Sequence, residues 1–240
     1  MPGLGVILST MRGLALVLPM VAAWSCSGSS GTDPPPGDDC LAPRAALSGE
    51  GTYYDADGTG NCGFDADPGL MVAALNAVDY DDAAWCGACV AVSGPDGEVV
   101  VRIVDQCPEC KHGDLDLSVE AFAKIAPISA GRVPITWHEV ACDVSGPISY
   151  QFKDGSNPYW VAIQIRDHRY PIAKLEARDG GEYVAIDRVD YNYFVREQGL
   201  GEGPFDLRVT DTRGQVLEDS GIALGDAVIR QGASQFPVCP

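Results

Sequence analysis

Cysteines constrain this chain more than any other feature of its sequence. Nine occur among its 240 residues, at positions 26, 40, 62, 86, 89, 107, 110, 142 and 239. Setting Cys26 aside as a candidate for lipid attachment leaves eight, and an even set is typical of disulfides formed in an oxidising compartment. We therefore expect an exported protein whose loops are joined by disulfide bonds.

Two Cys-x-x-Cys pairs allow other interpretations. Cys86 and Cys89 precede Cys107 and Cys110 by a gap of 17 residues, a spacing that fits a zinc ribbon. A thioredoxin-type redox site is disfavoured because no βαβ pattern surrounds either pair. Disulfides are the favoured interpretation, because other cysteines also need partners in an exported chain, but sequence alone leaves the connectivity open.

The first 25 residues are predicted to be an export signal, translated from Met11. The stretch "MRGLALVLPMVAAWSC" has one positive charge and an apolar run too short for an ordinary membrane span. Cys26 then heads a linker rich in Ser, Gly and Pro, residues 26–45, and resembles the cysteine of a bacterial lipoprotein signal. Two outcomes stay open: a lipid anchor at the cell envelope through Cys26, the chain's one expected membrane contact, or secretion after cleavage near Ala23.

The rest of the chain is predicted to form two β-rich domains, residues 46–144 and 145–240. In the first, two strands meet at Pro95-Asp96-Gly97, and Ser118 is a suitable N-cap for a short helix in "SVEAFAKI". From Gly146 onward, alternating apolar residues between Gly and Asp turns indicate a β-sandwich without helices.

Charge restricts the possible partners of both domains. Residues 41–144 carry five Lys or Arg against 17 Asp or Glu, net −12, and residues 145–240 carry ten against 14, net −4. Because neither offers a basic surface, nucleic acid is not an expected partner. We expect a monomer.

Several aspartates lie where sugar chemistry could occur. Asp114 and Asp116 are two residues apart, so on an extended segment they point to one face and would each raise the other's pKa. Such a pair suits an acid catalyst or a sugar-binding groove, although solvated loop aspartates are the commoner explanation. An inverting glycosidase also needs a second carboxylate as base, for which Asp55 and Asp57 on the loop "DADGTGN" are candidates.

Six motifs occur in one fixed order: "TYYDADGTGNCGF", "WCGACV", "VRIVDQCPEC", "GDLDLS", "NPYWVAIQIRDHRYPI" and "VDYNYF". Together they resemble the expansins, specifically the bacterial expansin-like proteins, from about residue 48 to the C-terminus. The resemblance implies a mainly β fold, with a six-stranded double-psi β-barrel followed by an immunoglobulin-like cellulose-binding domain. It also implies loosening of plant cell walls without hydrolysis and without a metal or organic cofactor.

The resemblance implies a glucan-binding groove in the barrel. It assigns Asp116 to the position of the general acid in the related family 45 endoglucanases, Asp105 to the groove aspartate and Thr52 to the hydroxyl neighbour of the acid. Tyr54 is a further candidate in this groove. Cys107 stands where the family often has an aromatic residue, so one sugar contact is in doubt.

In the second domain, the resemblance implies a cellulose-binding row of aromatic side chains, Tyr159, Trp160 and Tyr191, with Lys153 beside it. Tyr159 replaces a Trp that is common in bacterial relatives. Strand alternation in "YWVAIQIR" supports the row, because Val161 and the residues two and four further on share one face. Trp160, Ala162 and Gln164 are then predicted to share the opposite, outward face.

The family's disulfide pattern implies the pairs Cys62–Cys86 and Cys89–Cys142. Elimination then leaves Cys107–Cys110 and Cys40–Cys239, the last pair joining the two ends of the exported chain. The three histidines, His112, His138 and His168, lack metal-ligand spacing and are expected to be structural or surface residues.

The predicted function is non-hydrolytic loosening of cell walls, with cellulose and related neutral β-glucans as partners. One alternative is a weak inverting endo-β-glucanase with Asp116 as acid and Asp55 or Asp57 as base. Another is a carbohydrate-binding adhesin that uses neither groove aspartate.

Overall fold

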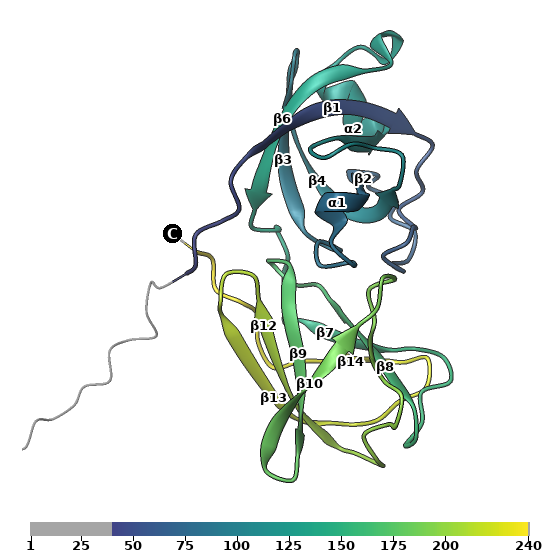
Figure 1. Cartoon of the computed structure of the whole chain (residues 1–240), viewed down its shortest axis with the longest axis vertical. Helices are drawn as coiled ribbons and strands as arrows, with labels where there is room; N and C mark the ends of the chain where they lie inside the picture. Colours follow the sequence, from purple (N-terminus) through teal and green to yellow (C-terminus); the bar gives the residue numbers. More distant parts are fainter. Residues whose placement is uncertain (1–39, 240) are drawn as a thin grey trace, which may run out of the picture. The chain divides into compact units, whose positions relative to one another are not determined.

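The computed structural model describes residues 40–239, which form a closed barrel and a second domain of strands. Figure 1 shows both. The predicted export signal, Cys26 and most of the predicted linker lie outside the described residues. Within residues 40–239, no helix is long and apolar enough to cross a membrane.

The barrel has six strands in the order β1-β5-β2-β4-β3-β6, which confirms the expected six-stranded closed barrel. Two of its strand pairs are parallel, β1 with β5 and β2 with β4, and the other four are antiparallel. Its elements are β1 (Leu47–Tyr54), β2 (Val72–Asn76), α1 (Ala77–Tyr80), β3 (Cys89–Gly94), β4 (Gly97–Cys107), β5 (Leu115–Ser118), α2 (Val119–Ile125), η1 (Ile128–Ala130) and β6 (Val133–Val140).

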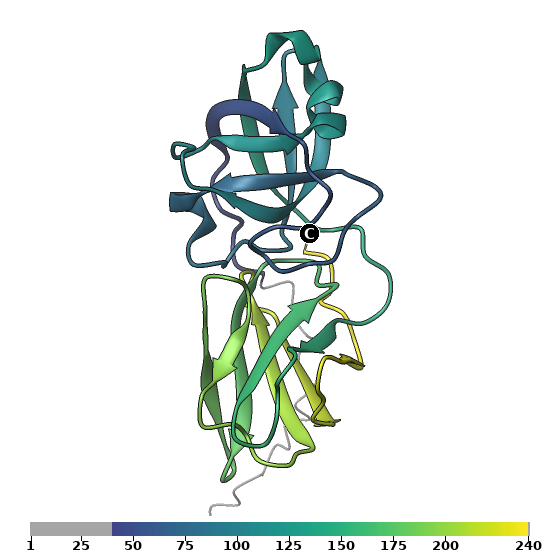
Figure 2. The ribbon, with the colours of Figure 1, turned by 90° about the vertical axis from the view of Figure 1, so that its right-hand side faces the viewer.

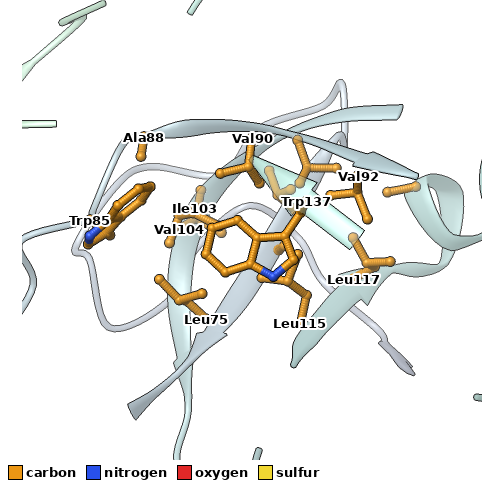
Figure 3. Close-up of a cluster of buried hydrophobic side chains, with 14 of the residues drawn as sticks. Leu75, Trp85, Ala88, Val90, Val92, Ile103, Val104, Leu115, Leu117 and Trp137 are labelled. Carbon is orange, nitrogen blue, oxygen red and sulfur yellow. The ribbon is translucent and has the colours of Figure 1, made fainter. Parts of the chain in front are cut away.

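Apolar side chains from every strand fill the barrel, since alternate residues of each strand point inward. Trp137 lies among them, beside Leu115 and Leu117 of β5 (Figure 3). Its indole N–H donates to the backbone oxygen of Gly113 at 2.8 Å, so this large ring is buried with its polar atom satisfied. That bond also holds the loop that precedes β5.

The hairpin turn and the helix that local sequence predicted in the barrel are both present. The hairpin between β3 and β4 turns at Pro95 and Asp96, with Gly94 opposite Gly97. Ser118 caps α2, because its hydroxyl accepts a hydrogen bond from the backbone N–H of Ala121. The one-turn helix α1, capped by Asn76, was not anticipated.

The second domain consists of strands, as expected: β7 (Ser149–Phe152), β8 (Val161–Arg166), β9 (Ile172–Asp179), β10 (Glu182–Arg188), β11 (Phe194–Arg196), β12 (Phe205–Asp211), β13 (Val216–Ile222) and β14 (Ile229–Gln231). In Figure 2 they run from green to yellow. They follow the order β13-β12-β9-β10-β11-β8-β7-β14. Strand β10 pairs with β9 through Glu182–Ile186 and with β11 through its last two residues, so it joins two sheets. One apolar core contains side chains from both sheets.

The structure contains four disulfides, and they are the four expected pairs: Cys40–Cys239, Cys62–Cys86, Cys89–Cys142 and Cys107–Cys110. Both Cys-x-x-Cys pairs are therefore fully used in disulfide bonds. Because zinc binds cysteine as a free thiolate, the zinc-ribbon interpretation is wrong.

Candidate functional site

The centre of the candidate site is a pair of side chains on adjacent parallel strands, Thr52 of β1 and Asp116 of β5. The two residues lie opposite each other in the strand register. Leu115 and Leu117 are fully buried, so Asp116 between them points out of the barrel core. The Thr52 hydroxyl donates a hydrogen bond to Asp116 Oδ1 at 2.5 Å. The fold thus joins two of the residues that the sequence singled out.

The environment of Asp116 favours its protonated form. Burial raises the pKa of this carboxyl, and the negative charges of Glu109 and Asp105 raise it further, whereas the Thr52 hydrogen bond and Arg132 lower it. A carboxyl group with a raised pKa retains its proton at higher pH and can donate it to a sugar oxygen. Asp116 can therefore serve as a proton or hydrogen-bond donor.

Asp114 has a different role from the one its spacing suggested. Its side chain is buried, and its two oxygens accept hydrogen bonds from the backbone N–H groups of Glu50, at 2.8 Å, and Lys111, at 3.0 Å. The neighbouring charges that raise the pKa of Asp116 come from Glu109 and Asp105. Asp114 is not among these charges, so its predicted effect on the pKa of Asp116 is wrong, and backbone donors hold Asp114 as a structural link between β1 and the loop before β5.

Asp116 opens onto a polar cavity of about 490 Å³. Its lining includes both members of the Asp116–Thr52 pair and charged residues that sequence reasoning missed, namely Glu50, Glu109, Lys111 and Arg132. The Cys107–Cys110 disulfide forms part of the wall, where the resemblance suggested an aromatic side chain. The cavity can therefore contact a ligand through carboxylates, cations and sulfur, and among residues 40–239 Tyr53 is the one aromatic residue in its lining.

Asp105 lies near this cavity but does not line it. An irregularity in the β2–β4 register leaves Val104 as an extra residue of β4 immediately before it. Such a bulge changes the direction of the next side chain. Asp105 Oδ1 accepts hydrogen bonds from the backbone N–H groups of Asn61, at 2.7 Å, and Gln106, at 2.8 Å. Asp105 thus holds the loop after β1 as well as carrying charge.

Tyr54 lies close enough to Asp105 and Asp116 for both charges to affect its pKa. Burial raises the pKa of its phenol, and the charges of Asp105, Asp116 and Asp57 raise it further. Its hydroxyl is buried and has no hydrogen-bond partner among residues 40–239. Tyr54 does not line the cavity of Asp116, and a buried hydroxyl without a partner costs free energy in the folded chain.

The two candidate bases, Asp55 and Asp57, do not line the cavity of Asp116. Both are exposed. Asp57 accepts hydrogen bonds from the backbone N–H and the hydroxyl of Thr59, and these bonds lower its pKa. This arrangement is that of a solvated turn.

The second candidate surface is the aromatic row, which we define as Tyr159, Trp160 and Tyr191. Tyr159 is 79% exposed and Tyr191 38%, whereas Trp160 is half-buried. The ring of Tyr193, buried and missed by sequence reasoning, lies 5.9 Å from that of Tyr191 and supports it. The ammonium of Lys153 lies 5.9 Å from the Tyr191 ring and 5.2 Å from the Tyr193 ring.

The predicted outward face of β8 is only partly outward. The strand begins at Val161, after Trp160. Ala162 and Gln164, predicted to share the face of Trp160, are fully buried. A barrel loop contacts Gln164, whose side-chain amide donates to the backbone oxygen of Cys62 at 2.8 Å. The predicted outward face is therefore wrong beyond Trp160, and for Gln164 the reason is its contact with the barrel.

The histidines take structural or surface positions, as expected. His168 is buried and bonds the backbone oxygen of Tyr170, and burial lowers its pKa to about 3. His112 contacts Asp79 at 3.0 Å at the surface, and His138 is exposed. In the part of the chain that the structure describes, no group of three or more His, Cys, Asp or Glu residues is arranged to hold a metal ion.

Known proteins match both halves of this structure. A family model described as "Lytic transglycolase" matches residues 47–137. Expansin-YoaJ of Bacillus subtilis is 34% identical over 193 residues, which cover 75% of this chain and 83% of that protein. Expansin-like protein 1 of Dictyostelium discoideum is 31% identical over 196 residues, covering 75% of this chain and 68% of that protein.

Solved structures give the same result. The apo crystal structure of a Clavibacter michiganensis expansin is 31% identical, with a TM-score of 0.74, and the match covers 81% of this chain and 100% of that one. A mutant of the Clavibacter expansin in complex with cellohexaose matches with a TM-score of 0.75. These relatives support the double-psi form of the barrel and the second β domain. This chain is 34% identical to the Bacillus expansin over most of both proteins, and it shares the barrel and the second β domain with the Clavibacter expansin. The chain therefore belongs to the expansin family.

Proposed function

We propose that this chain binds cellulose and related neutral β-glucans and loosens contacts between glucan chains without hydrolysing them. The observation that carries the proposal is the Asp116–Thr52 pair, a carboxyl group with a raised pKa at the edge of a polar cavity. The cellohexaose complex of the Clavibacter expansin supports a glucan as the ligand.

In this proposal the aromatic row and the barrel cavity have different roles. The aromatic row adheres to cellulose, because flat rings cover the apolar faces of glucose units while the sugar hydroxyls stay in water. In the barrel, Asp116 and Thr52 hydrogen-bond one glucan chain, and Asp105 and Tyr54 flank them. Competition for the hydroxyls of that chain weakens its bonds to neighbouring chains.

Weak inverting hydrolysis is the second candidate function, and Glu109 favours it over a base on the loop after β1. Glu109 lines the cavity of Asp116 and its charge raises the pKa of that acid. The other carboxylates of the cavity are already engaged: Glu50 forms an ion pair with Arg132 at 2.7 Å, and Asp114 binds backbone N–H groups. An inverting enzyme uses one acid and one base on opposite sides of the bond that it cleaves.

A paired assay separates these functions. Filter-paper strips incubated with the protein are tested for tensile strength, and the same supernatants are assayed for reducing ends after long incubation. The proposal expects weaker strips without reducing ends. Reducing ends that disappear in Glu109→Gln, but persist in the control Glu120→Gln on the exposed side of α2, would instead identify an endoglucanase. Binding without weakening would identify an adhesin.

Export and lipid attachment belong to the same proposal, since cellulose lies outside the cell. Cys26 is the proposed lipid site, and Cys26→Ser should move the protein from the membrane fraction to the soluble exported fraction. Unchanged partitioning would contradict an anchor at this residue.

A further inference from the structure

Tyr159 of the aromatic row cannot hold its own position. Its side chain is 79% exposed, so little packing around the ring fixes its direction. Its orientation must come from the backbone of the short turn that carries it. The contacts of that turn therefore decide whether Tyr159 and Trp160 can act as one surface.

We propose that Gly199 is a positioning residue for cellulose binding, because the loop of residues 197–201 holds the turn that presents Tyr159 and Trp160. The inference rests on the proposed function of the aromatic row. It adds a loop that makes no contribution of its own to the stacking surface.

The turn is closed by its own backbone. Asn157 and Trp160 exchange two backbone hydrogen bonds, of 2.7 and 3.2 Å, and Pro158 and Tyr159 form the tip between them. The Asn157 side chain accepts a further bond from the backbone N–H of Tyr159 at 2.9 Å. These bonds set the shape of the turn, but none of them sets its angle to the sheet.

The loop of residues 197–201 supplies that second constraint. The backbone N–H of Gly201 donates to the oxygen of Pro158 at 3.0 Å. Gly199 lies so close to the same turn that a Cβ placed on it would be 2.0 Å from the Pro158 oxygen and 2.6 Å from Tyr159 Cα. The approach is between two backbones, so no flexible side chain could move aside to make room.

Strand pairing explains why this loop meets this turn. β8 starts directly after Trp160, and its first residue, Val161, pairs with Arg196 at the end of β11. The loop leaves β11 at the point where the turn enters β8, and Leu200 within it packs against the sandwich core. Tyr191 lies just before the other end of β11. The β8–β11 pair therefore places all three members of the row.

Gly199→Ala tests the inference, with Gly180→Ala, in the turn between β9 and β10, as its matched control. Both glycines have positive φ, +67° and +58°, so alanine is strained at both, but a Cβ at Gly180 meets nothing within 4 Å. Depletion isotherms on microcrystalline cellulose should show about five- to tenfold weaker binding for Gly199→Ala, the effect of partly losing one stacked ring. Gly180→Ala should bind within about twofold of the parent. Equal losses in both would overturn the inference.

A double-mutant cycle separates positioning from general damage to the fold. Because Gly199 acts through the turn, adding Gly199→Ala to Tyr159→Ala should cost much less than it costs in the parent, with melting temperatures recorded for every variant. Full additivity, or parent-like binding by Gly199→Ala while Tyr159→Ala binds weakly, would overturn this inference alone. Parent-like binding by Tyr159→Ala would overturn the proposed role of the row, and the inference with it.

Leu200→Ala covers the case in which Gly199→Ala does not fold. It weakens the attachment of the loop to the core without adding an atom beside the turn. It should lower cellulose binding about twofold to threefold and be non-additive with Tyr159→Ala in the same way. Unchanged binding by a folded Leu200→Ala would contradict a supporting role for this loop.

Discussion

The barrel cavity and the aromatic row differ in how they contact a ligand and in how their side chains are held. The cavity is polar, and its central acid is half-buried and bonded to a residue 64 positions away in the chain. The row is aromatic and partly exposed, from the half-buried Trp160 to the 79% exposed Tyr159, and it stands on one turn and one strand pair. The cavity can therefore select hydroxyl geometry, whereas the row offers rings that can match only a flat apolar face.

This difference implies that binding and loosening respond to separate mutations. A charge or hydrogen bond removed from the cavity leaves the exposed rings unchanged. A ring removed from the row leaves the Asp116–Thr52 pair intact. The predictions below test that separation, from the largest expected effect to the smallest.

Asp116→Asn should abolish loosening, with at least a tenfold loss in paper weakening, while cellulose binding stays within about twofold of the parent. The amide keeps the shape of the side chain but cannot donate a carboxylic proton. Thr52→Val, which removes only the 2.5 Å hydrogen bond, should lose part of the activity. Asp55→Asn, outside the cavity, is the control and should match the parent. Loosening by Asp116→Asn at the parent's rate would contradict a role for the cavity in loosening.

Trp160→Ala should weaken binding to microcrystalline cellulose by ~1 to 3 kcal/mol, about five- to 150-fold, by analogy with the stacking of aromatic side chains on other flat ligands. Tyr183 offers a matched control, because it is a partly exposed aromatic on β10 that stacks with Arg178 and Arg208 outside the row. Tyr183→Ala should bind like the parent. If both substitutions weakened binding equally, the row would not be the ligand surface.

Asp211, at the end of β12, also has a carboxyl with a raised pKa, but it lies outside both the cavity and the aromatic row. It therefore tests whether such a carboxyl can affect stability without affecting binding. Burial raises its pKa to about 6, and Arg213 and backbone N–H groups lower it. The folded chain therefore holds this proton between about pH 4 and pH 6, where the unfolded chain releases it. Its contribution to stability is fully present below that window and is lost as the pH rises through it.

The free energy of unfolding, measured in urea, should thus fall between pH 4 and pH 7. The fall should be smaller in Asp211→Asn than in the parent, by on the order of 2 kcal/mol. Cellulose binding at any one pH should be the same in both proteins. Parallel stability curves would mean that Asp211 does not hold a proton in the folded state.

Salt should have the smallest effect. In the proposed function the row contacts uncharged sugar faces, so cellulose binding should change by less than about twofold when the Debye length falls to about 3 Å at 1 M salt. Residues 41–144 are net −12 and residues 145–240 net −4, so acidic pectin should be repelled at low salt. Isotherms on cellulose and on pectin-containing walls at both salt levels check this. A collapse of cellulose binding in salt would place the ligand on a charged surface instead.

Much of the fold could be predicted because its signals are local. The hairpin at Pro95, the helix cap at Ser118 and the alternating strands after Gly146 each depend on a few neighbouring residues. The site was predicted less well. Asp114 and Asp116 look equivalent in sequence, yet backbone donors from β1 and a nearby loop make one structural. The predicted outward side of β8 was wrong beyond Trp160, where Ala162 and Gln164 are buried and Gln164 bonds a barrel loop.

The sequence by itself determined the class of the two domains and the residue types that could bind a sugar, since periodicity, turn residues and motif order are properties of short segments. Only the tertiary structure decided which of those residues share a surface. Glu109 and Arg132 reach the cavity of Asp116 from separate loops. Gly199 meets the turn of Tyr159 only because β11 pairs with β8. Such contacts join residues far apart in the chain, and their closeness follows from strand order and packing, which no short segment encodes.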